Sequence, residues 1–115
     1  MATADEHSSQ AQHNLDFAAS LDRERFPDWI ATGLFYAAVH LVEAMMRKRG
    51  IKESGSHTKR NKTLRAQFQP VWREYQPLWC FSRLARYRCL AVKTENLEYI
   101  ERRFRRLELE VGRVK

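Results

Sequence analysis

Residues 28–49 read DWIATGLFYAAVHLVEAMMRKR, and this stretch decides the fold. Its apolar residues cover most of the circumference of a helix, which is typical of a helix packed on several sides. Pro27 breaks any helix that precedes it, and Gly50 stands where a helix commonly ends. With Asp28 as the N-cap, we predict a largely buried central helix from Asp28 to Arg49.

The polar residues of this stretch form one narrow stripe. At 100° per residue they fall within an arc of about 80° on the helix surface: Thr32, Tyr36, His40, Glu43 and Arg47. One interpretation is that the stripe is the solvent-facing edge of an otherwise buried helix. The other is that it lines a cleft or subunit interface, where Tyr36 and Glu43 orient His40 and the histidine acts as acid or base or holds a phosphate.

The rest of the chain is also predicted to be helical, because runs that alternate at strand length are hard to find. Residues 1–9 are small and polar and are expected to be disordered. Helices are expected at 9–25, 57–67 and 70–91, and a last helix is expected after a cap at Thr94. Ser56 or Ser54 caps the helix at 57–67, and Pro77 kinks or divides the helix at 70–91. The last helix carries the clearest apolar stripe: Leu97, Ile100, Phe104, Leu107 and Val111. We therefore predict one all-α domain, residues 10–115.

The net charge of +7 is unevenly divided along the chain. Residues 1–50 hold five basic and seven acidic groups, whereas residues 51–115 hold sixteen basic and seven acidic groups. A positive field concentrated in one part of a domain attracts polyanions, so nucleic acid is the leading partner class. The alternative is that the basic helices serve solubility alone.

Cysteine spacing and apolar composition bear on the cellular location. Cys80 and Cys89 lie about 13 Å apart along one predicted helix, too far for a disulfide. Reduced cysteines and a start without a basic-then-apolar leader favour a cytoplasmic protein. The longest apolar run contains His40 and Glu43, which disfavours a membrane span.

A basic cluster opens the predicted helix at residue 57. His57, Lys59 and Arg60 lie near its free backbone N–H groups and the positive end of its dipole. Residues 47–65 hold eight Lys or Arg and one acid, Glu53. Phosphate is the expected ligand, and a solvated face around a loop is the alternative.

A second basic cluster lies near the end of the predicted helix at 70–91. Arg83 and Arg86 are one turn apart, and Trp79 and Tyr87 accompany them. Two guanidinium groups beside an aromatic ring can clamp a phosphate or stack on a base. Helix packing explains the aromatic residues equally well.

Five short motifs follow one another between residues 26 and 91: PDW at 27–29, FYxxxHxxEA at 35–44, SHxxR at 56–60, YxxL at 75–78 and SRxARY at 82–87. Their order and spacing resemble the HEPN superfamily of compact helical domains, found in prokaryotic defence, toxin and nucleotidyltransferase-associated proteins. The resemblance implies a four- to five-helix bundle, often dimeric, that is associated with RNA or nucleotides.

Ribonucleases of this superfamily carry an arginine, four to six intervening residues and a histidine. This sequence departs from that motif, since the nearest case, Arg49 to His57, has seven residues between them. A composite site is the alternative, with His40 and His57 as base and acid if the helix at 57 folds over the central one. No cofactor is expected, and His40 with Glu43 offers too few ligands for a metal site.

We therefore expect a HEPN-like module in a prokaryotic defence or toxin–antitoxin context that binds RNA, a nucleotide or a nucleoprotein partner. The rivals are a metal-independent endoribonuclease using His40 and His57, and a non-enzymatic subunit that contacts an acidic protein. The expected assembly is a homodimer or a complex with a nucleotidyltransferase or effector subunit. The predicted ligand contacts are Tyr36, Glu43, Lys59, Arg60, Arg83, Arg86 and Tyr87.

Overall fold

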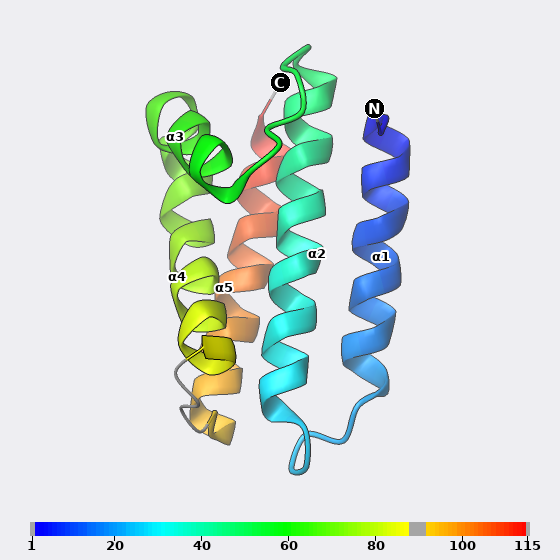
Figure 1. Ribbon diagram of the computed structural model, residues 1–115, viewed down its shortest axis with the longest axis vertical. Coiled ribbons are helices and arrows are strands. Elements are labelled where there is room, and N and C mark those ends of the chain that lie inside the picture. The colour runs from blue at the N-terminus through cyan, green and yellow to red at the C-terminus, as the bar shows by residue number, and fades with distance from the viewer. Residues whose placement is uncertain (1, 88–91, 115) are drawn as a thin grey trace.

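The computed structural model describes residues 2–87 and 92–114, with the backbone alone at Ala85 and Tyr87. This part of the chain forms a bundle of 40 × 25 × 24 Å (Figure 1). Its helices are α1 (Ala4–Ser20), α2 (Pro27–Lys48), α3 (His57–Gln67), α4 (Gln69–Tyr87) and α5 (Thr94–Arg113). The all-α bundle predicted from the sequence is confirmed.

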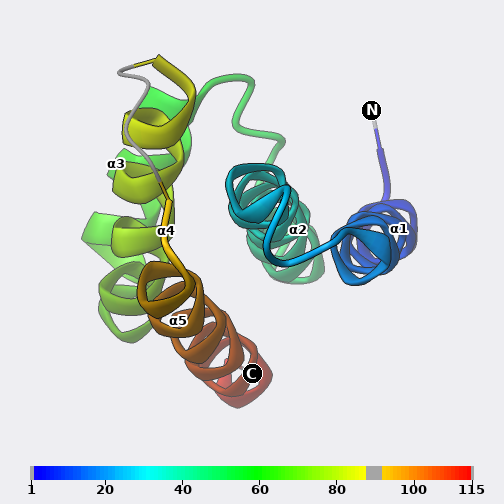
Figure 2. The ribbon, with the colours of Figure 1, turned by 90° about the horizontal axis from the view of Figure 1, so that it is seen from below.

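Helix α2 is the centre of the bundle. It packs against α1 on one side and against α4 and α5 on the other (Figure 2). Most of its side chains between Ile30 and Met46 are buried, although Trp29 in its first turn is 54% exposed. By length and composition α2 could also cross a membrane, but its burial against three neighbouring helices is typical of a core helix.

The ends of α2 are set by backbone conformation. Pro27 lies in the first turn, where its missing N–H costs no hydrogen bond. Asp28 is consequently inside the helix, and the predicted Asp28 cap is wrong: the N-cap is Phe26, which makes no side-chain cap hydrogen bond. At the other end, Gly50 has a φ of 77°, the left-handed conformation that commonly ends a helix.

Helix α1 begins at Ala4, so the disorder expected for residues 1–9 is corrected from Ala4 onward. The Thr3 hydroxyl accepts from the N–H of Glu6 at 3.1 Å, and the Glu6 carboxylate accepts from the N–H of Thr3 at 2.9 Å. This capping box starts the helix. The main packing partner of α1 is α2, where a Cβ added to Gly33 would lie 3.3 Å from that of Ala18.

Helices α3 and α4 form the opposite side of the bundle. Helix α3 spans the predicted residues, and the Ser56 hydroxyl accepts from the N–H of Lys59 at 3.1 Å. Helix α4 runs through Pro77 as one helix, so its predicted division in two is wrong. Proline removes one backbone hydrogen bond, but the burial of Tyr75 and Leu78 on either side stabilises the helical course.

Helix α5 covers α2 and α4. The N–H of its N-cap, Lys93, donates to the side-chain oxygen of Asn96 at 3.0 Å, so the predicted cap at Thr94 is wrong by one residue. The stripe that it buries is the predicted one, with Val111 partly exposed: Leu97, Ile100, Phe104 and Leu107.

Candidate functional site

The polar stripe of α2 faces side chains of other helices. No α-carbons of α2 and α3 lie within 8 Å of each other, so side chains alone join these helices. Thr32 and Glu43 are buried, and Tyr36, His40 and Arg47 are partly buried. The interpretation of this stripe as a solvent-facing edge is therefore wrong.

Glu43 lies at the centre of the polar contacts between α2 and α3. Its Oε1 accepts from Nε of Arg60 at 3.0 Å, and its Oε2 accepts from Nη2 of Arg47 at 2.9 Å. Glu43 is 1% exposed and Arg60 is 8% exposed. Buried charges require partners, and these two groups compensate each other. Their contacts attach α3 to α2. Because Glu43 and Arg60 are bonded to each other, we assign them a structural role in place of the predicted ligand contacts.

Arg60 also orients His57. Nη1 of Arg60 donates to Nδ1 of His57 at 2.9 Å. A guanidinium group can only donate, so Nδ1 is unprotonated and Nε2 of the neutral ring carries the proton. Partial burial, followed by the positive charges of Arg60 and Arg86, lowers the pKa of His57 below its usual 6.5. The ring is therefore a neutral hydrogen-bond donor at pH 7.

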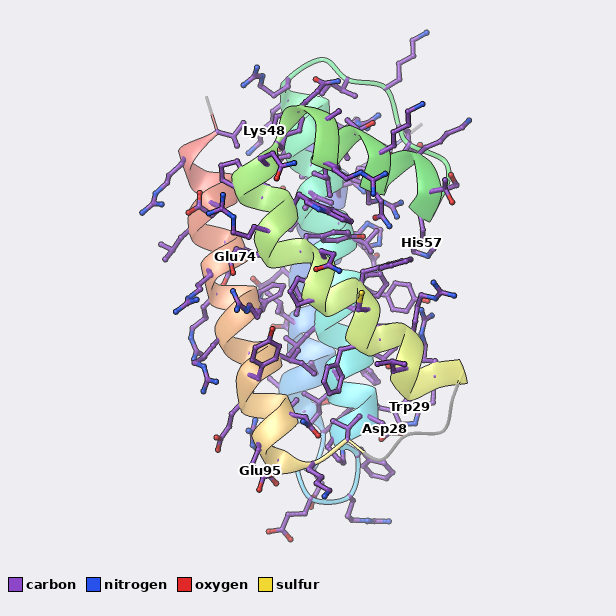
Figure 3. All side chains as sticks on the ribbon, turned by 90° about the vertical axis from the view of Figure 1, so that its left-hand side faces the viewer. Asp28, Trp29, Lys48, His57, Glu74 and Glu95 are labelled. Carbon is purple, nitrogen blue, oxygen red and sulfur yellow. The ribbon has the colours of Figure 1, made fainter. Side chains whose placement is uncertain are left out.

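Arg86 reaches the same place from α4. Its Nη1 donates to the Tyr36 hydroxyl at 2.5 Å. Its guanidinium carbon lies 5.3 Å from the centre of the Tyr36 ring and 5.8 Å from that of Phe35. The His57 ring also lies against Phe35, with centroids 5.8 Å apart, and Figure 3 shows His57 where α3 begins. The structure thus brings together three of the predicted residues, Tyr36, His57 and Arg86.

His40, by contrast, contacts α1. Its Nδ1 lies 3.0 Å from Nδ1 of His7, and Nε2 of His7 lies 3.2 Å from the Glu53 carboxylate. Burial, followed by the positive charges of His7 and Arg60, lowers the pKa of His40. In residues 2–87 and 92–114 no contact joins His40 to His57, so the predicted acid–base pair is not observed as a direct pair.

His7 and Glu53 are site residues that the sequence analysis missed. His7 is 5% exposed and lies on the buried face of α1 with Ala11 and Ala18. The signal that could have revealed it is the spacing of Thr3 and Glu6, which marks the start of a helix before His7. In the sequence, Glu53 stands out only as the one acid among the basic residues of 47–65.

Two exposed arginines, Arg65 of α3 and the predicted Arg83 of α4, each lie over a tryptophan ring. The Arg65 guanidinium lies 5.6 Å from the Trp72 ring centre, and the Arg83 guanidinium lies 5.0 Å from that of Trp79. Both arginines are exposed and both tryptophans are partly buried. Trp72, Trp79 and Arg83 are spaced so that they share one side of α4. We call these four side chains the arginine–tryptophan face.

The remaining predicted positions are less informative. Lys59 is exposed at the start of α3, whereas the side chain of Tyr87 lies outside the described part of the chain. Cys80 is a free thiol, and Cys89 also lies outside the described residues. In residues 2–87 and 92–114, no group of three or more His, Cys, Asp or Glu side chains is arranged to hold a metal ion.

Comparison with known proteins adds no assignment. No family model, no curated protein and no solved structure matches this chain. Its function is therefore inferred from the geometry and charge of the molecule itself.

Proposed function

We propose that the protein is a HEPN-like helical module that binds single-stranded RNA through the arginine–tryptophan face. The observation that carries this proposal is the stacking of Arg65 on Trp72 and of Arg83 on Trp79. A guanidinium group braced on a ring keeps N–H groups available for a phosphate. An unpaired base can stack on the outer plane of the same guanidinium group.

The charge of each helix supports this location. Helix α3 holds four basic residues and no acid, and α4 holds three basic residues and one acid. Helix α5 holds five of each, and α1 holds three acids and no Lys or Arg. The helices with a net positive charge are therefore those that carry the arginine–tryptophan face. The exposed Lys59 and Lys62 extend this field along α3.

The test is binding of a fluorescently labelled single-stranded RNA, measured by anisotropy between about 50 and 200 mM salt, a range over which phosphate contacts weaken strongly. The double variant Arg65→Gln/Arg83→Gln is expected to bind about tenfold more weakly. The slope of log affinity against log salt should fall by about 1.4, because two phosphate contacts are lost.

The matched control is Arg105→Gln/Arg106→Gln, which removes two exposed arginines from α5. This variant should bind within about twofold of the parent, because α5 has no excess positive charge. Equal losses in the two variants would mean that net charge alone attracts RNA. Absence of binding by the parent protein would reject the proposal and leave an acidic protein as the partner.

A second candidate function is metal-independent cleavage of RNA. It is favoured by the group formed by Tyr36, His57 and Arg86, in which a neutral histidine with a proton on Nε2 lies beside a cation. Such a group can donate a hydrogen bond to a phosphate oxygen as negative charge develops on it, while the arginine stabilises that charge. This candidate predicts cleavage of a mixed RNA pool in the presence of a chelator. Cleavage should be lost in His57→Ala and retained in His13→Ala, which changes an exposed histidine of α1.

The proposed assembly is a cytoplasmic homodimer or a complex with a nucleotidyltransferase or other effector subunit. Light scattering of the purified protein distinguishes the homodimer from a monomer that requires another partner.

A further inference from the structure

Three side chains from distant parts of the sequence form a continuous chain of contacts outside the arginine–tryptophan face. Glu53 lies in the connection between α2 and α3, His7 lies in α1 and His40 lies in α2. Glu53 Oε1 is 3.2 Å from Nε2 of His7, and Nδ1 of His7 is 3.0 Å from Nδ1 of His40. The His7 side chain is 6% exposed, so its ring nitrogens rely on these two partners.

The donor and acceptor roles in this chain follow from elementary chemistry. The Glu53 carboxylate only accepts, so Nε2 of His7 carries a proton. When His7 is neutral, its Nδ1 is an acceptor, and Nδ1 of His40 must donate to it. A neutral His40 then has no proton on Nε2, and this atom is an acceptor with a free lone pair.

We propose that Glu53, His7 and His40 form a proton relay whose open end is Nε2 of His40, and that this atom accepts a proton from a hydroxyl group of a bound ligand. Within the described residues Nε2 of His40 has no hydrogen-bond partner. The buried side-chain atoms that lack a hydrogen-bond partner do not include Nε2 of His40, so this nitrogen is exposed to solvent. A ligand hydroxyl can therefore approach it.

The transfer is balanced in protons and charge. The hydroxyl O–H bond breaks and its proton binds Nε2 of His40, which leaves an alkoxide on the ligand. The proton on Nδ1 of His40 then passes to Nδ1 of His7. His40 is neutral again, with its proton now on Nε2, and the positive charge is on His7 beside the Glu53 carboxylate. Only one proton fits between the two Nδ1 atoms, so the pair carries at most one positive charge.

The charged groups around the relay favour this direction of transfer. Burial of His40 and the positive charge of Arg60, on α3, disfavour a lasting cation on His40. The carboxylates of Glu43, on α2, and Glu53 act in the opposite sense, and Glu43 is already bonded to Arg60. Glu53 contacts His7 directly, so His7 is the better place for the positive charge. His7 is a positioning residue, because it acts through His40.

The test is nitrogen NMR of the histidine rings in the free protein, which reports the proton on each ring nitrogen. At pH 7.5, a value about one unit above the usual histidine pKa, His40 is expected as the neutral Nδ1–H tautomer. The variant His7→Phe removes the acceptor and should convert most of the His40 signal to the Nε2–H tautomer. The control His13→Phe makes the same change on the exposed side of α1 and should leave the His40 signal unchanged.

A second variant keeps the proposal testable if His7→Phe fails to fold. Glu53→Gln preserves an acceptor for His7 but removes the negative charge, so the pH at which the histidine pair takes up its proton should fall by about one unit. The relay is rejected if neutral His40 of the parent is the Nε2–H tautomer, or if proton uptake does not respond to Glu53→Gln. These spectra are recorded without RNA, so failure of the relay is distinguishable from failure of RNA binding.

Discussion

At the scale of single residues, Glu43 is the most consequential side chain of the molecule. It is a fully buried carboxylate on the central helix, bonded at 3.0 Å to Arg60 and at 2.9 Å to Arg47. Nε and Nη1 of Arg47 are buried without a partner among the described residues, which makes the second bond more important. Loss of Glu43 leaves two cations in the interior.

The variant Glu43→Gln should therefore lower the free energy of unfolding by about 3 kcal/mol, because an uncompensated buried charge is costly. Urea denaturation followed by circular dichroism measures this change. The control Glu98→Gln alters an exposed carboxylate of α5 and should change stability by less than about 0.5 kcal/mol. Similar losses of unfolding free energy in both variants would show that the buried ion pair does not stabilise the attachment of α3 to α2.

His40 and His57 make the stability of the protein depend on pH. An unfolded histidine binds a proton near pH 6.5, whereas burial and nearby cations lower the pKa of His40 and of His57 in the folded protein. Below pH 6.5 the unfolded chain therefore binds more protons, and the free energy of unfolding should fall as the pH falls. Urea titrations between pH 7.5 and 5.5, within about one unit of the histidine pKa, measure this slope. The slope should be shallower in His57→Gln; an unchanged slope would contradict this assignment.

At the scale of elements, α1 depends on its first turn. Its main packing partner is α2, and its capping box satisfies backbone N–H groups that have no partner within the helix. The start of α1 also carries His7, so the order of this turn affects the relay.

Removal of the cap by Thr3→Ala should cost about 1 kcal/mol of stability. The loss should appear as faster amide exchange in the first two turns of α1, measured by mass spectrometry. The control Thr94→Ala changes a threonine in the first turn of α5 whose side chain does not cap the helix, and it should have a smaller effect. Equal exchange in the parent and Thr3→Ala would mean that packing on α2 alone orders this turn.

Helix α4 shows how packing overrides a local signal. Pro77 is a correct reason to expect an interruption, because its ring removes a backbone donor. The helix nevertheless continues, with buried side chains from Val71 to Ser82 facing the core. One lost hydrogen bond is smaller than the hydrophobic contribution of those residues. Continuity of α4 places Trp72 and Arg83 on the same side.

At the scale of the whole molecule, opposite charges lie on opposite sides. Acidic α1 and basic α3 are separated by the central helix (Figure 2). Single-stranded RNA should therefore slow amide exchange in α3 and α4 and leave α1 unchanged, because phosphate contacts require the positive side. Exchange with and without RNA measures this difference. Protection centred on α1 would place the RNA site elsewhere.

The sequence by itself determined the helical class, the central helix and the buried stripe of α5, because hydrophobic periodicity is a local property of the chain. It also indicated Tyr36, His57 and Arg86 as candidate site residues, but it did not show that they lie together. Only the tertiary structure decided that Arg60 is bonded to Glu43 and that His7 contacts both His40 and Glu53. Such contacts join residues far apart in sequence, and the packing of helices selects the pairs.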